Sequence, residues 1–256
     1  MRRFKTFSRL IETAEANGMN KIFIQRAMQV TSFNLLATDF QSLDYKKEIQ
    51  YLFSTHFFPR IDIKFQDTVD AAKLNTEITK LKRANKSNFE HLHKYNLKGI
   101  GPGEVVLYFL LNKGHLGGGS SAGVDLVVGQ QKYEIKAVDL SGDGKQVFNF
   151  KTGGTFNTSD LIARALKMKS DVNGSGEGVS KGVINKIKEQ MPTEWKKLED
   201  DYRKRVYDNY FKNHVMIFMN NKTAKIGEII AVKTVAKKDI EFERVTSGVI
   251  KPRVNI

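Results

Sequence analysis

The sequence predicts an α/β protein, and three observations lead to that class. Two short segments, 124–128 and 133–137, alternate apolar and polar residues with the period of a half-exposed strand. A continuous apolar run over 215–219 is typical of a strand buried in the middle of a sheet. Segments with apolar residues at helical spacing lie before and after these strands. We therefore expect a sheet flanked by helices.

The charge of the chain favours a polyanionic partner. Its 256 residues carry 42 Lys and Arg against 28 Asp and Glu, a net charge of +14. The excess is positive in each of the three segments made by dividing the chain at residues 95 and 170. Such a distribution is typical of a protein that wraps a duplex through phosphate contacts. The lack of cysteine excludes disulfides and thiolate metal sites.

Residues 1–95 are expected to form a mainly helical region that is accessory or contacts DNA. The segments predicted to be helical are 6–17, 20–36, 44–55 and 68–85. A short strand is predicted over 61–65, where apolar residues alternate after Pro59. The basic end of the last helix, Lys80 to Lys86, is expected to touch phosphates or to be a solvated helix end.

Residues 96–256 are expected to form the second domain. The helix predicted over 104–112 is apolar nearly all round, which indicates burial against the sheet. The glycine-rich segment 115–123 is interpreted as a loop. The remaining predicted elements are a strand over 147–151, a helix from Thr158 or Ser159 with Leu161, Ile162, Ala165 and Leu166 inside, helices over 181–190 and 193–209, and strands over 215–219, 226–235 and 240–245. The cluster Arg203-Lys204-Arg205 is interpreted as a solvated face, with a phosphate contact as the alternative.

The strands 124–128 and 133–137 carry the candidate chemistry. Because side chains alternate along a strand, Asp125 lies on the face opposite its apolar neighbours. By the same alternation, Glu134 and Lys136 share the polar face of the second strand. We expect these three side chains to point together toward solvent.

The connection between the strands sets their register. Gly129 and Gln130 can serve as a two-residue hairpin turn, which places Asp125 directly opposite Glu134. A loop two residues longer would pair Asp125 with Lys136 instead, and all three side chains would still share one face. Carboxylates opposite each other repel by roughly 0.2–1 kcal/mol, so a cation between them is expected. Mg²⁺ suits such a site, because it takes one or two carboxylates and completes its shell with water and phosphate oxygens.

These residues resemble the motif of a nuclease superfamily. Glu104 on a helix, Asp125 on a strand and Glu134-Ile135-Lys136 on the next strand look like the PD-(D/E)xK superfamily, which has the restriction-endonuclease-like fold. The resemblance covers about residues 99–170, with the strand near 214–220 as an extension. It implies a mixed central sheet flanked by helices. The chain departs from the motif at Val124, where the family often has Pro.

The resemblance also implies an activity and roles. Asp125 and Glu134 would ligate Mg²⁺, for which Mn²⁺ is a substitute, and Glu104 would assist at the metal. Lys136 would position or activate the attacking water. The expected protein is a metal-dependent DNA endonuclease of restriction or phage type that hydrolyses phosphodiester bonds. A homodimer is a further expectation, because double-strand cutters often need two active sites.

Other interpretations of the same residues stay open. The pattern Asp/Glu-x-Lys recurs at 44–46, 62–64, 143–145 and 194–196. Only 62–64 lies in a strand-like segment, and it lacks an upstream Asp-bearing strand. Glu104 could simply complement the dipole of its helix, and Glu134 and Lys136 could be solvated charges.

Around the site, four further residues are expected to contact nucleic acid: Ser120, Ser121, Lys151 and Thr152. The alternative function is a non-catalytic nucleic-acid-binding or virion packaging protein that retains the nuclease fold. A third is a basic structural protein with no site. No apolar run reaches the length of a membrane span, and no signal-peptide core follows the basic N-terminus. We therefore expect no membrane partner and a cytoplasmic location, or the virion if the protein is phage-encoded.

Overall fold

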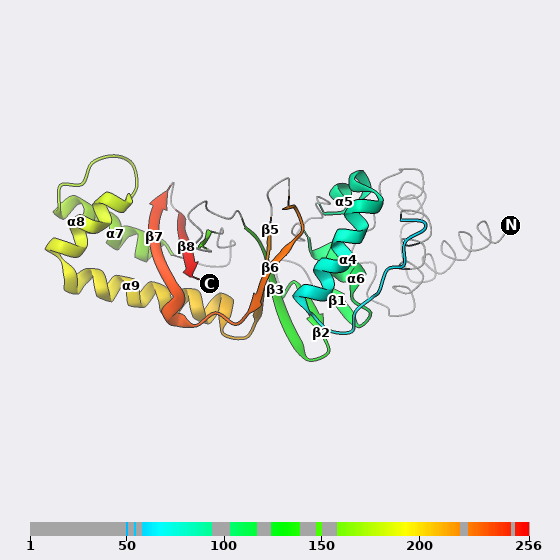
Figure 1. Cartoon of the computed structure of the whole chain (residues 1–256). Helices are drawn as coiled ribbons and strands as arrows, with labels where there is room; N and C mark the ends of the chain where they lie inside the picture. Colours follow the sequence, from blue (N-terminus) through cyan, green and yellow to red (C-terminus); the bar gives the residue numbers. More distant parts are fainter. Residues whose placement is uncertain are drawn as a thin grey trace, which may run out of the picture. The chain divides into compact units, whose positions relative to one another are not determined.

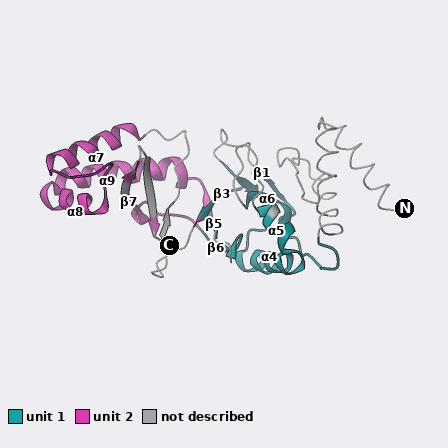
Figure 2. Ribbon diagram, turned by 90° about the horizontal axis from the view of Figure 1, so that it is seen from above, with its two compact units in different colours: residues 1–137, 217–232 teal, residues 138–216, 233–256 magenta. Residues whose placement is uncertain are grey.

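The computed structural model describes Gln50, Ser54 and residues 58–93, 103–116, 124–138, 147–149, 158–220, 225–246 and 249–255. These residues form two compact units (Figure 2). Unit 1 comprises the described residues of 1–137 and 217–232, and unit 2 those of 138–216 and 233–256.

The two units divide the chain differently from the regions 1–95 and 96–256 that we expected. The helices predicted over 6–17 and 20–36, on which the expected helical N-terminal region depends, lie outside the described residues. So does the helix predicted over 44–55, apart from Gln50 and Ser54. The helical N-terminal region therefore stays a prediction.

A five-stranded mixed sheet lies almost entirely in unit 1 and is flanked by helices, as expected for an α/β protein. Its order is β1 (Gly114–Leu116), β2 (Leu126–Val128), β3 (Gln131–Val138), β5 (Val215–Asn220) and β6 (Ile229–Lys233). The prediction of a buried central strand over 215–219 is confirmed, because β5 has a neighbour on each side and is buried from Met216 onward. The prediction of a loop from 115 was wrong at its start, since Gly114–Leu116 pairs with β2.

Three helices complete the described part of unit 1 (Figure 1). They are α4 (Ala71–Ala84), α5 (Lys86–His93) and α6 (Glu104–Leu110). Every residue of α6 is buried, as its apolar sequence predicted. The apolar residues of α4 at helical spacing, Leu74, Ile78 and Leu81, are buried too. Asn75 on α4 hydrogen-bonds both the N–H and the C=O of Ile229 at 2.8 Å each, so this helix covers part of the edge strand β6.

The strand predicted over 61–65 was wrong. The segment is irregular, and the adjoining bridge joins Gln66 to Leu111 alone. Its apolar residues nevertheless contact the core: Ile63 is buried, and Ile61 and Phe65 pack against it. The alternation therefore reflects burial of every second side chain without a strand partner.

Unit 2 combines three helices with a separate three-stranded sheet (Figure 1). Its helices are α7 (Ser159–Asp171), α8 (Lys181–Gln190) and α9 (Pro192–Val206), followed by a π-helical turn (Tyr207–Phe211) and a 3₁₀ turn (Lys237–Asp239). The sheet order is β4 (Val147–Asn149), β8 (Val249–Asn255) and β7 (Ile240–Thr246). The three helices contact one another, and α8 and α9 contact β7.

Two sequence predictions for unit 2 need correction. The strand predicted over 147–151 does not join the sheet that carries the candidate site, because β4 pairs with β8. We did not predict β8, since Pro252 interrupts its pattern. Leu166, expected inside, is 39% exposed, and Met168 is buried in the same helix. Among the described residues, no helix combines the length and apolarity needed to cross a bilayer.

Candidate functional site

The hairpin of β2 and β3 is the scaffold of the candidate site. Its strands pair Val128 with Gln131 and Leu126 with Tyr133, which confirms the predicted register. Gly129 in the turn has φ +62°, a conformation that favours glycine. Asp125 was predicted to lie on the first strand, and that was wrong. Because β2 begins at Leu126, Asp125 lies in the bend that precedes it.

Asp125 is held by two hydrogen bonds to β3. Its N–H donates to the carbonyl of Tyr133 at 3.2 Å. Its Oδ2 accepts from the N–H of Ile135 at 2.8 Å. A backbone donor thus fixes this carboxylate beside the strand that carries the other two candidate residues.

Glu134 and Lys136 are in direct contact. The Lys136 ammonium donates to Glu134 Oε1, and this ion pair is mostly shielded, with the Lys136 side chain 21% exposed. We expected these side chains to point toward solvent, and for Glu134 that was wrong, because the residue is only 8% exposed. A carboxylate can be buried at this depth because a cation pairs with it.

Glu104 approaches the same charges from α6. It is the first residue of that helix and 4% exposed. Gly103 precedes it with φ +89°, and a Cβ there would lie 2.1 Å from Met219 Sδ. Only glycine fits this close approach, which packs the start of α6 on the end of β5. The negative charge of Glu104 contributes to the raised pKa of Lys136, so the two side chains interact electrostatically.

The site carries more negative than positive charge. Burial, then the neighbouring Glu134 carboxylate, raises the pKa of Asp125 to about 6, against the opposing effects of Lys136 and the Ile135 N–H. Burial lowers the pKa of Lys136, but the carboxylates of Glu134 and Asp125 outweigh it and raise that pKa overall. All three carboxylates therefore act on the ammonium of Lys136, which only partly offsets the effects of burial and of Glu134 on Asp125.

This donor set fits a hard divalent cation in its chemistry. Glu104, Asp125 and Glu134 offer the oxygen ligands that Mg²⁺ prefers, and a cation would offset the burial and repulsion that raise the pKa of Asp125. Among the described residues, no three acidic or histidine side chains converge closely enough to hold a metal ion. Oε1 of Glu134 is in contact with the Lys136 ammonium, so this oxygen could bind a metal ion only by giving up that contact.

The other predicted residues fall elsewhere. Ser120, Ser121, Lys151 and Thr152 lie outside the described residues, so their predicted nucleic-acid contacts are untested. In the rival motif, Asp62 and Lys64 are exposed. No hairpin partner faces that segment in the part of unit 1 that the structure describes.

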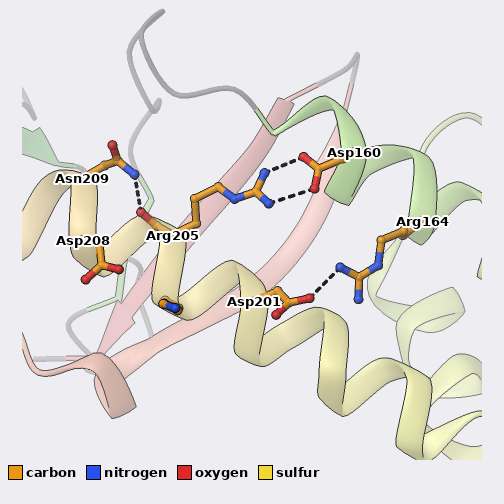
Figure 3. Close-up of a pocket in the computed structure, with 7 residues that line it drawn as sticks. Asp160, Arg164, Asp201, Arg205, Asp208 and Asn209 are labelled. Atoms are coloured by element: carbon orange, nitrogen blue, oxygen red, sulfur yellow. Dashed lines mark hydrogen bonds and ion pairs between the residues drawn. The ribbon is translucent and has the colours of Figure 1, made fainter.

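Unit 2 has a second gathering of charges, in a pocket of about 460 Å³ (Figure 3). Its lining residues are Asp160, Arg164, Asp201, Lys204, Arg205, Asp208 and Asn209. Arg205 forms a two-pronged ion pair with Asp160, with Nη2 2.8 Å from Oδ2, and Arg164 Nη1 lies 2.7 Å from Asp201 Oδ2. These pairs join α7 to α9, a contact that the sequence did not predict because its partners are far apart in the chain.

Comparisons of this chain with protein-family models, with curated proteins and with solved structures find no match.

Proposed function

We propose that this protein is a Mg²⁺-dependent DNA endonuclease that hydrolyses phosphodiester bonds, with a restriction-endonuclease-like core in unit 1. One observation carries the proposal: carboxylates from α6 and the β2–β3 hairpin all act on the ammonium of Lys136, beside which Asp125 and Glu134 repel each other. The net charge of +14 supports DNA as the partner.

The side chains divide the work by their chemistry. Asp125 and Glu134, with Glu104 behind them, would hold Mg²⁺, for which Mn²⁺ could substitute. The ion would polarise the scissile phosphate and stabilise charge on the leaving oxygen. The Ile135 N–H donates to Asp125 Oδ2 and so fixes the orientation of this carboxylate. Lys136 is held protonated by its acidic neighbours and would orient water and stabilise negative charge on the phosphate.

Incubation of the full chain with supercoiled plasmid and Mg²⁺ tests this function. We expect nicked or linear DNA, lost in Glu134→Ala and in Lys136→Ala. Asp160→Asn removes a carboxylate that is also paired with a cation but lies in the pocket of unit 2, outside the candidate site, and is the control. Plasmid that stays supercoiled with every divalent ion, at protein concentrations that bind it fully, would refute the hydrolysis.

The second candidate is a non-catalytic nucleic-acid-binding protein, for example one that packages DNA in a virion. The direct contact between Lys136 and Glu134 favours it, because a permanent ion pair there would serve stability alone. This candidate predicts tight, salt-sensitive DNA binding without cutting, and no change in binding when Glu134 becomes Ala.

A further inference from the structure

The junction between α4 and α5 gathers three cations. Lys82 and Arg83 lie in the last turn of α4, and Lys86 is the first residue of α5, with Asn85 between the helices. We call Lys82, Arg83 and Lys86 the basic junction (Figure 1 shows α4 and α5). It belongs to unit 1, which also holds the residues of the candidate site.

Local stability explains only part of this cluster. Cations in the last turn of a helix are favourable, so Lys82 and Arg83 suit the end of α4. Lys86 has the opposite placement, because it begins α5, whose first turn contains no acidic residue. A cation there opposes the helix dipole by typically 0.3–1 kcal/mol.

Lys86 also gains little from its neighbours. Its Nζ lies 3.8 Å from Glu90, and its side chain is 74% exposed, where ion pairs contribute little. It repels Lys82, but this repulsion is the smallest of the effects on the pKa of Lys82, which is lowered chiefly by burial. Glu228 and Glu90 act in the other direction without cancelling them. The contacts of Lys86 within the fold therefore contribute little to stability.

Lys82 is held in place while it remains accessible. Its Nζ lies 5.6 Å from the centre of the buried Phe89 ring. That ring packs against Gly227 in the β5–β6 turn, where a Cβ would lie 2.7 Å from Phe89 Cζ. The ammonium thus has a fixed support that an exposed lysine lacks. Arg83 is exposed and has no ion-pair partner among the described residues.

We propose that the basic junction contacts the phosphate backbone of the nucleic acid that the candidate site cleaves, an inference that rests on the proposed function for the identity of its ligand. Lys82, Arg83 and Lys86 follow one another closely along the chain, Arg83 and Lys86 are exposed, and a DNA strand offers regularly spaced phosphates to such cations. Because these contacts would go to the backbone, the junction would add affinity without sequence preference.

The test is the salt dependence of DNA binding by the full chain. Binding of a fluorescein-labelled duplex is followed by anisotropy in EDTA, so that no cutting interferes. In K82Q/R83Q/K86Q we expect the slope of log K against log salt to become shallower by about 2 to 3, since each phosphate contact contributes about 0.9. The charge-retaining K82R/R83K/K86R should keep the wild-type slope, which separates lost charge from lost folding.

A matched control removes three other cations. K167Q/K186Q/K196Q lies on the exposed faces of α7, α8 and α9 in unit 2 and changes the net charge equally. We expect its slope to stay at the wild-type value. An equal change of slope in the two glutamine variants, or none in K82Q/R83Q/K86Q, overturns the proposal. The proposal is also overturned if K82Q/R83Q/K86Q loses binding to phosphatidylserine vesicles but keeps the wild-type slope of log K against log salt for DNA.

Failure of this inference is distinct from failure of the proposed function. If wild-type protein leaves plasmid uncut but the junction variant changes the salt slope as expected, hydrolysis is refuted and the DNA-binding surface stands. If plasmid is cut and the slope does not change, the nuclease stands and the basic junction has no part in binding.

Discussion

The candidate site in unit 1 and the charged pocket in unit 2 both gather acidic and basic side chains, but they balance them differently. In the pocket, three acids meet three bases, and two of the bases form ion pairs with acids on the facing helix. In the site, three acids act on Lys136, and burial with Glu134 raises the pKa of Asp125 to about 6.

This difference distinguishes ion pairs that stabilise the fold from carboxylates that would be stabilised by a bound cation. The pocket's pairs are half-exposed, and their charges are already compensated. The site contains partly buried carboxylates that repel each other, and this arrangement costs stability unless a cation binds. Perturbed pKa values of this kind are typical of functional sites.

The largest expected effect compares the loss of one acid in each region. Glu134→Gln should reduce the rate of plasmid cleavage by about 10²–10³-fold, the usual cost of removing one electrostatic contact to a reacting group. Asp160→Asn should leave the rate within twofold. Gel quantification of supercoiled plasmid over time measures both. Equal losses would show that the pocket takes part in the reaction, and the comparison would then fail.

The next effect concerns the two glycines that support the site. Gly103→Ala forces a side chain into φ +89° and against Met219 Sδ, so we expect the free energy of unfolding to fall by about 3 kcal/mol. Gly129→Ala also has positive φ but nothing within 4 Å, so about 1 kcal/mol is expected. Urea unfolding of both variants measures the gap. Equal losses would mean that the packing of α6 on β5 does not position Glu104.

A smaller effect should appear in the pH dependence of stability. Because the pKa of Asp125 is raised, the folded state binds a proton more tightly than the unfolded state, and stability falls as pH rises from about 4 to about 6. The fall should be on the order of 2 kcal/mol. Asp125→Asn should abolish it, and millimolar Mg²⁺ at neutral pH should raise the melting temperature of wild type only.

The pocket should show the opposite sign. Arg205 holds the pKa of Asp160 below its usual value through their hydrogen bonds, so this pair stabilises above that usual value and its contribution is lost as pH falls. In Asp125→Asn, stability that falls only as the pH drops below about 3.8 is compatible with this. A wild-type profile without any fall would contradict the repulsion proposed for the site.

The smallest effect is the loss of an ion pair in the pocket. Arg205→Met should lower the free energy of unfolding by less than about 1 kcal/mol, because both partners are substantially exposed. The loss should shrink further in high salt. Chemical denaturation at two salt concentrations measures the loss. A loss of several kcal/mol would show that the pair contributes more to stability than an exposed ion pair does.

Sequence periodicity predicted the local scaffold of the site well. The hairpin register followed from Gly129-Gln130, because a two-residue turn fixes which residues face each other. The burial of α6 followed from its uniformly apolar sequence. The sequence could not show that Asp125 would bond the Ile135 N–H, since that depends on where β2 begins.

Chain-distant partners were decided by the tertiary structure alone. Segments 61–65 and 147–151 both contain apolar residues at alternate positions, yet the first has no strand partner among the described residues and β4 pairs with β8 in a different sheet. Strand periodicity reports which side chains become buried; it does not report which segment supplies the hydrogen bonds.

By itself, the sequence determined the charge of the chain, the faces of the hairpin and the identities of the acids and the lysine that share one of them. Only the tertiary structure decided that Glu104 interacts electrostatically with Lys136, that Glu134 is buried in contact with Lys136, and that two arginines in the pocket of unit 2 are paired with acids. The reason is that local patterns fix the direction of a side chain, whereas burial and ionic partners depend on contacts between segments far apart in the chain.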